Sequence, residues 1–147
     1  MLKNRFLSLI LIILLVLVVA LTVYIIVVPH QSEPFTEFYI LGPDGKASNY
    51  PTNLTSNETG NLIIGIVNHE NKPTSYHLVV TSDGIVQIDQ VLTLNNKQEL
   101  EIPFNFTAGD PGIREMDFSL YKLPDDSNVY QSLSLWLNIT SSPNETV

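Results

Sequence analysis

Cysteine is absent from the sequence, basic residues are few, and one stretch of 23 residues carries no charge at all. Without cysteine the chain can form no disulfide, no thiolate metal site and no thiol nucleophile. Its 7 basic residues stand against 15 acidic ones, and the resulting net charge of −8 disfavours binding to nucleic acid. These absences exclude a disulfide-stabilised mini-domain and argue against a nucleic-acid-binding protein.

The uncharged stretch predicts a transmembrane helix over residues 6–28. Nineteen of its 23 residues are Leu, Ile, Val or Phe, and none is glycine. At about 1.5 Å per residue such a helix spans roughly 34 Å, enough to cross a hydrocarbon core of about 30 Å. The alternative is a cleaved signal peptide, but its apolar region is usually only about 7 to 15 residues long. We therefore expect a retained single-pass anchor in contact with membrane lipid.

The charges on either side of the anchor predict its orientation. Lys3 and Arg5 precede it, whereas the first basic residue after it is Lys46. The part after the anchor has 5 basic and 15 acidic residues, a net charge of −10. Because positive flanks stay on the cytoplasmic side, the N-terminus should be cytoplasmic and the acidic part extracellular.

The part of the chain after the helix has the composition of a β protein. Only two alanines occur there, Ala47 and Ala108, while Val, Ile, Thr, Tyr and Phe are frequent. Turn signals such as Asp83-Gly84 recur about every ten residues, which is typical of a sandwich or barrel. Seven strands are expected, at residues 35–42, 61–69, 75–82, 85–94, 98–106, 114–122 and 131–140.

Polar and apolar residues alternate in three of these strands, which indicates one buried and one wet face. In the last strand, for example, Leu135 and Leu137 should face the core, while Trp136 and Asn138 should face solvent. Pro103 has no N–H to donate to a neighbouring strand, so its strand should lie at the edge of a sheet.

Five Asn-x-Thr sequons follow the helix, and this tripeptide is the acceptor sequence for N-glycosylation. They begin at Asn53, Asn57, Asn105, Asn138 and Asn144. Asn105 and Asn138 fall on expected wet faces of strands, and the other three fall in expected loops or in the tail. We predict a glycoprotein modified at several of these positions. The alternative is an asparagine-rich polar surface.

Trp136 is the only tryptophan, and on the expected wet face it could bind a sugar or a protein partner. Tyr121 and Tyr130 are candidate neighbours in the same binding surface. The alternative is that Trp136 covers neighbouring side chains or an edge loop.

Signatures of catalysis and metal binding are missing from the sequence. There is no Gly-x-Ser-x-Gly, no His-Glu-x-x-His and no phosphate-binding glycine loop. His69 and His77 flank an expected hairpin, but no third ligand has suitable spacing, and His30 lies at the membrane boundary. We therefore expect no enzyme activity, no catalytic residue, no metal site and no cofactor.

Several segments resemble an archaeal family of predicted membrane proteins catalogued as domain of unknown function 1616. They include Phe35–Gly42, Tyr50–Leu54, Gly65–Glu70, Asp110–Gly112 and Ser132–Trp136. The resemblance implies an external β domain, but it brings no established activity. Gly65–Glu70 also resembles immunoglobulin-like modules of archaeal surface proteins.

Together these features predict a cytoplasmic stub (1–5), a transmembrane helix (6–28), a stalk (29–34), an extracellular domain (35–141) and a flexible tail (142–147). The domain is expected to be an immunoglobulin-like antiparallel β-sandwich of about seven strands. Its expected role is non-catalytic, as a surface interaction module or an accessory subunit of an envelope or membrane complex, with a protein partner. The alternative is a carbohydrate-binding module of the cell envelope that uses Trp136 and the nearby tyrosines.

Overall fold

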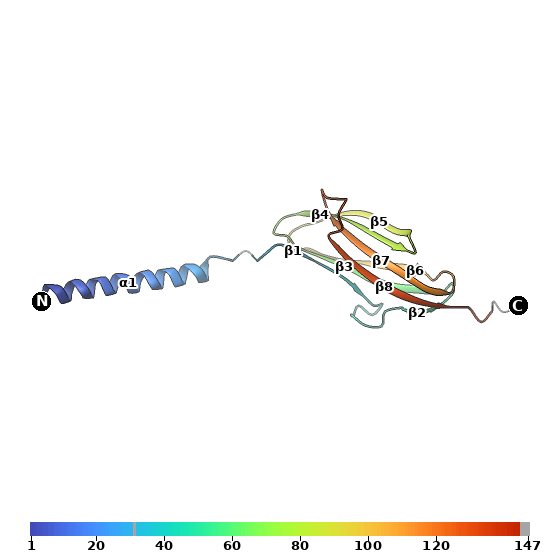
Figure 1. Ribbon diagram of the computed structural model, residues 1–147, viewed down its shortest axis with the longest axis horizontal. Helices are drawn as coiled ribbons and strands as arrows, with labels where there is room; N and C mark the ends of the chain where they lie inside the picture. The colour runs from blue at the N-terminus through green and yellow to red at the C-terminus, as the bar shows by residue number, and fades with distance from the viewer. Residues whose placement is uncertain (31, 145–147) are drawn as a thin grey trace. The chain divides into compact units, whose positions relative to one another are not determined.

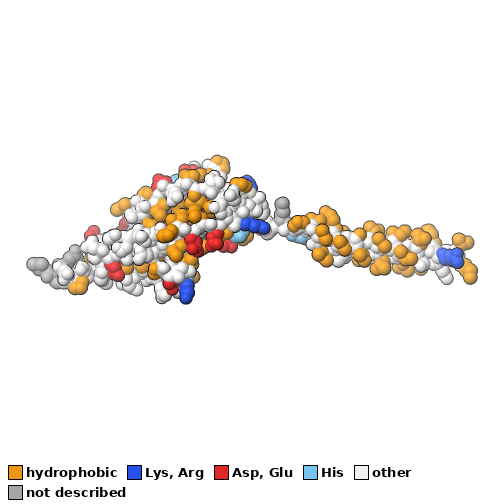
Figure 2. All heavy atoms as spheres, turned by 180° about the vertical axis from the view of Figure 1, so that it is seen from behind, with side chains coloured by type: hydrophobic (Ala, Val, Ile, Leu, Met, Phe, Trp, Pro, Cys, Tyr) orange, Lys and Arg blue, Asp and Glu red, His pale blue; other side chains and the backbone are white. Residues whose placement is uncertain are grey.

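The computed structural model describes residues 1–30 and 32–144, in two units that divide between Glu33 and Pro34. The first unit is the helix α1 (Leu2–Val27), which ends where Val28 becomes extended ahead of Pro29. Hydrophobic side chains line α1 along its whole length (Figure 2). Among the described residues it is the one helix long and apolar enough to cross a membrane, and it takes in most of the expected stub.

The second unit consists of eight strands in two sheets, and this confirms the predicted β-sandwich (Figure 1). The three-stranded sheet has the order β1 (Phe35–Leu41), β3 (Thr59–His69), β6 (Glu99–Thr107). The five-stranded sheet has the order β2 (Asn53–Thr55), β8 (Gln131–Thr140), β7 (Gly112–Lys122), β4 (Thr74–Ser82), β5 (Ile85–Leu94).

The seven expected strands all form, with bounds within two residues of those predicted. The eighth strand, β2, was not expected, and it runs parallel to β8 whereas all other pairings are antiparallel. Its three residues contain one apolar side chain, Leu54, so no alternation could reveal it. Pro103 lies in β6, which is an edge strand as predicted.

The core lies between the two sheets and is built from the inner faces that the alternation predicted. Leu135 and Leu137 are buried, while Trp136 and Asn138 are exposed. Phe104 of the three-stranded sheet meets Phe118 of the five-stranded sheet edge to face, with ring centroids 6.3 Å apart. Burial of each such large side chain contributes about 1.5 to 3 kcal/mol to the stability of the domain.

The sandwich has a stalk end, where the chain enters at Phe35, and a far end. The far end holds the Asp83-Gly84 turn, in which both residues have positive φ, 49° and 79°. This is the tight two-residue hairpin that the dipeptide predicted. Strands β3, β5 and β7 start at the far end, and β1, β4, β6 and β8 finish there.

Candidate functional site

The strand β5 is an open edge of the five-stranded sheet and pairs only with β4. The short strand β2 covers only Asn138–Thr140 of β8, and the edge strand β6 carries Pro103, which cannot donate to an added strand. On β1, the carbonyls of Thr36 and Ile40 accept hydrogen bonds from the side chains of Gln131 and Tyr50. Among the described strands, β5 is therefore a long open edge, ten residues in length.

The hydrogen bonds of β4 identify the β5 groups that face away from the sheet. The carbonyl of Ser75 accepts a hydrogen bond from the N–H of Leu123, which follows β7. The backbone N–H and C=O groups of Ser75, and of the residues two and four positions later, therefore point toward β7. His77 is one of them, and its partner on β5 is Val91. The N–H and C=O of Val91 therefore point to the open edge, as do those of the residues two positions before and after it.

Exposed apolar side chains accompany this unpaired backbone. Ile85, Val86 and Val91 are 67%, 54% and 62% exposed. The strand has no proline or lysine, the residues that commonly protect an edge, and Asp89 is its only charge. A signal for this surface exists in the sequence, because β5 has apolar residues on both faces instead of a clean alternation.

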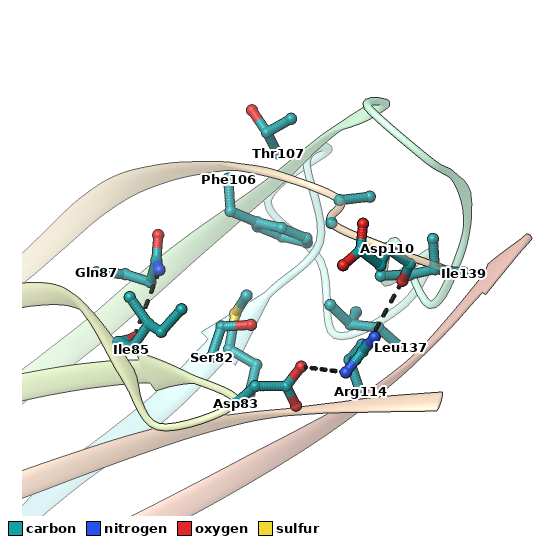
Figure 3. A pocket seen from close by; sticks show the side chains of 13 residues that line it. Ser82, Asp83, Ile85, Gln87, Phe106, Thr107, Asp110, Arg114, Leu137 and Ile139 are labelled. Carbon is teal, nitrogen blue, oxygen red and sulfur yellow. Dashed lines mark hydrogen bonds and ion pairs between the residues drawn. The ribbon is translucent and has the colours of Figure 1, made fainter. Parts of the chain in front are cut away.

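A pocket of about 410 Å³ opens beside β5 at the far end of the sandwich (Figure 3). Ile85 and Gln87 of β5 line one side, and Phe106 of β6 lines the other. Met116 and Leu137, both buried core residues, also line it. The walls formed by Ile85, Phe106, Met116 and Leu137 thus offer apolar contacts, while the rest of the lining is largely polar.

Arg114 gives this pocket a polar rim. Its guanidinium donates to the carboxylate of Asp83 at 3.0 Å and to the carbonyl of Asp110 at 3.4 Å. Because both partners of the ion pair are partly exposed, it adds at most about 1 kcal/mol to stability. The pair fixes the hairpin turn of β4 and β5 against the start of β7.

A buried carboxylate, which the sequence analysis missed, joins the two sheets at the stalk end. Glu70 accepts hydrogen bonds from Tyr130 at 2.7 Å, from Thr36 at 2.8 Å and from Lys122 at 3.2 Å. Burial raises the pKa of Glu70, but these three donors together outweigh burial and hold the pKa below its ordinary value. Tyr76 completes the network by a hydrogen bond to Thr36. Every polar group is paired, so the arrangement is structural.

His77 bridges β4, β5 and the loop after β7. One ring nitrogen contacts Asp126, and the other contacts Asp89 at 2.7 Å. The hydrogen bond with Asp126, followed by that with Asp89, raises the pKa of His77 above its ordinary 6.5. Since both nitrogens are engaged, neither is free to ligate a metal. His69 lies on β3 of the other sheet, where it contacts Glu37 at 3.2 Å.

The three aromatic residues proposed as a binding surface lie at different places. Trp136 is 58% exposed on the outer face of the five-stranded sheet, opposite Glu115. Tyr121 shares that face but is six residues from Glu115, roughly 20 Å along β7. Tyr130 turns instead toward Glu70 at the stalk end. The structure does not bring these side chains together.

All five sequon asparagines are exposed, and they gather at the far end. Asn53 and Asn138 lie side by side on β2 and β8, with Asn138 donating to Asn53 at 3.4 Å. Asn105 lies two residues before the end of β6, and Asn57 lies in the loop between β2 and β3. Asn144 follows β8, while the threonine of its sequon lies outside the described residues.

Among the described residues, no group of three or more His, Asp or Glu side chains is arranged to hold a metal ion. The stretch Asp125–Asn128 is an internally bonded turn, because the Asp125 carboxylate accepts from the backbone N–H groups of Ser127 and Asn128.

A family model described as "Domain of unknown function (DUF1616)" matches residues 29–138. No curated protein matches the sequence. Among solved structures, the fold is similar to the CARDB domain of the PF1109 protein from Pyrococcus furiosus, in complex with di-metal ions, at a TM-score of 0.56 and 15% identity, covering 75% of this chain and 96% of that one.

The fold is also similar to part of alpha-2-macroglobulin from Escherichia coli, at a TM-score of 0.56 and 15% identity. That match covers 76% of this chain and 17% of the other. At these identities the likeness shows the immunoglobulin-like sandwich and nothing about activity. An apolar N-terminal helix followed by such a domain is compatible with a membrane-anchored module.

Proposed function

Because the chain belongs to the DUF1616 family, which has no assigned activity, its role must come from its own residues, and we propose a non-catalytic interaction module. In this proposal α1 holds the sandwich on the extracellular side of the cell membrane. The sandwich then binds a protein partner of the envelope or membrane by adding a strand of that partner to β5.

The observation that carries the proposal is the open edge of β5. Strand addition joins main-chain groups of the partner to a free edge and places alternate side chains in neighbouring pockets. The outward N–H and C=O of Val91 can bond to the main chain of the partner. The exposed Val86 and Val91 side chains and the pocket beside Ile85 can contact its side chains. The edge would contribute several hydrogen bonds of about 0.5 to 1.5 kcal/mol each, plus apolar burial, against an association cost of at least about 4 kcal/mol.

The same surface specifies the chemistry of the partner. An extended segment with alternating apolar side chains fits, because β5 is apolar on both faces around a single acidic residue, Asp89. The net charge of −10 on the outer part favours a neutral or basic segment over an acidic one. The anchor would restrict the search to partners at the same membrane.

A proline on the open edge tests this proposal directly. Val91→Pro removes one outward N–H while leaving the β4–β5 hydrogen bonds in place. Crosslinking and pull-down of the full chain from gently solubilised native membranes should then give about tenfold weaker partner capture. The matched control is Val91→Thr, which keeps the N–H and the β-branched shape and should retain capture.

Two outcomes contradict the proposal, the first its interaction role and the second the addition of a strand at β5. One is recovery of the wild-type chain only as a free monomer at native abundance. The other is equal capture by the proline and threonine variants, both still folded as judged by circular dichroism.

The second candidate function is a carbohydrate-binding module of the envelope, and the exposure of Trp136 favours it. It would act through Trp136 alone, since Tyr121 and Tyr130 lie elsewhere. Glycan-array binding that survives Trp136→Ala would remove this mechanism.

A further inference from the structure

Two large exposed side chains flank one of the five sequons. Trp136 lies two residues before Asn138 on the same face of β8, and Ile113 lies opposite Asn138 on β7. Trp136 is 58% exposed and Ile113 is 73% exposed. The two side chains therefore form a small exposed apolar surface beside Asn138.

The distances suit a sugar attached to Asn138. Residues two apart on a strand are separated by roughly 6.6 to 6.8 Å, and cross-strand neighbours have Cβ atoms about 4.5 to 5.5 Å apart. A pyranose ring linked to the amide nitrogen of Asn138 would therefore lie within reach of both Trp136 and Ile113. The apolar C–H face of a sugar packs well on the electron-rich face of an indole ring.

We propose that Asn138 carries an N-linked glycan whose first sugar packs on Trp136 and Ile113 of the same chain. In the linking step the Asn138 Nδ2 loses a proton and bonds to C1 of the sugar. The bond from C1 to the phosphate oxygen of a lipid-phosphate-linked oligosaccharide breaks, and its electron pair leaves with the phosphate. The glycan is thus an internal ligand of the exposed tryptophan, an inference that rests on the proposed extracellular location.

Asn138 differs from the other sequons in this respect. The residue two positions before the asparagine is Trp136 at Asn138, but Pro51 at Asn53 and Pro103 at Asn105. At the two remaining sequons it is Thr or Ser. Asn53 is a close match in every other way, because it is exposed, lies beside Asn138 on the same face and has threonine two residues later.

The placement of the sequons supports a glycosylated far end. The far half of the domain holds Asn49, Asn53, Asn57, Asn61, Asn105, Asn138 and Asn144, and five of these seven begin a sequon. The stalk half holds Asn68, Asn71, Asn95, Asn96 and Asn128, and none begins a sequon. Positions scattered along the sequence therefore converge at the end remote from the point where the chain enters the domain.

A double-mutant cycle on the full chain, purified from its native cells, tests the proposal. Glycopeptide mass spectrometry should find Asn138 modified. Asn138→Gln should then lower the Tm of the domain by about 2 to 6 °C in the Trp136 background and by much less in the Trp136→Ala background. Asn53→Gln is the matched control and should give the same Tm change in both backgrounds.

Four results overturn the inference. An unmodified Asn138 in a chain modified at other sequons shows that this site is not used. An equal loss of Tm in both Trp136 backgrounds shows that the sugar does not pack on the indole. A chain with no modified sequon also refutes it, and labelling of the domain from outside the cell would show that the extracellular location still holds. A protein partner that protects Trp136 from solvent in the unmodified chain would assign the patch to that partner.

Discussion

At the scale of single residues, Glu70 carries a large desolvation cost, because its carboxylate is charged while its side chain is only 4% exposed. A buried charge is stable only when donors surround it, and Tyr130, Thr36 and Lys122 supply them from three different segments. Thr36 uses its hydroxyl proton on Glu70, so it accepts from Tyr76. The hydrogen bonds of this network thus connect β1, β4 and the end of β7 to the end of β3.

Glu70→Gln should lower the free energy of unfolding by about 1.5 to 3 kcal/mol at neutral pH, because charged hydrogen bonds are replaced by neutral ones. The folded state holds the pKa of Glu70 below its unfolded value, so its stabilisation is present above about pH 4.5 and is lost as pH falls through the folded pKa. The difference between wild type and variant should therefore shrink in acid, as measured by urea unfolding. The exposed Glu37 provides a control, and an equal effect of Glu37→Gln would contradict this account.

Residue-scale prediction from the sequence succeeded where one strand determines the outcome. The exposure of Trp136 and Asn138 and the burial of Leu135 follow from alternation within β8 alone. Glu70 was not identified, because it follows a strand and its donors come from sites 34 to 60 residues away in the sequence. No local pattern reports such a convergence.

At the scale of elements, His77 fastens β5 and the loop after β7 to β4. Its imidazole can donate to both Asp126 and Asp89 only when it is protonated. Those two carboxylates lie on different elements, and the tilted ring of Tyr121 lies 5.5 Å from the imidazole. The strand β5, which is proposed to receive a partner, is therefore held to β4 in part by the imidazole of His77, whose protonation depends on pH.

The stabilisation by His77 should be complete below about pH 6.5 and should fade as pH rises through its raised folded pKa. The free energy of unfolding should exceed that of His77→Gln at pH 6, and the gap should narrow toward pH 9. Chemical unfolding at several pH values measures this gap. The control is His69→Gln, at a histidine on the other sheet. In this background, replacing His77 by Gln should give a difference in the free energy of unfolding that narrows with pH as it does in the wild type. If the difference in free energy of unfolding between wild type and His77→Gln widens with pH, protonated His77 does not hold β5 and the loop after β7 to β4.

The elements themselves were largely predictable, whereas their order was not. Turn dipeptides and alternation located seven strands, and Pro103 placed β6 at an edge. The open edge of β5 depends on which strands neighbour it, and strand order is set by long-range packing that single strands do not encode. The brief strand β2 forms because Leu54 packs in the core beside Ile139 of β8, a contact between positions far apart in the chain.

At the scale of the whole molecule, the two units divide the hydrophobic residues between them. The 23 uncharged residues account for almost all of α1, while the sandwich buries a separate core of its own. The sequence predicts such a division because an apolar helix and an alternating strand have different periods. A binding surface for a partner could not be predicted from the sequence, because the open edge of β5 and the pocket beside it form only when the strands assemble.

The orientation of the chain in the membrane is the last prediction, and the absence of cysteine makes it simple to measure. A single cysteine has no competing thiol in this chain. Ala47→Cys, in an exposed loop of the sandwich, should react with a membrane-impermeant maleimide in intact cells. Asn4→Cys, between Lys3 and Arg5, should react only after the cells are permeabilised, because the basic flank stays in the cytoplasm. The reverse pattern would place the sandwich inside, and it would exclude both glycosylation at the far end and an extracellular partner for β5.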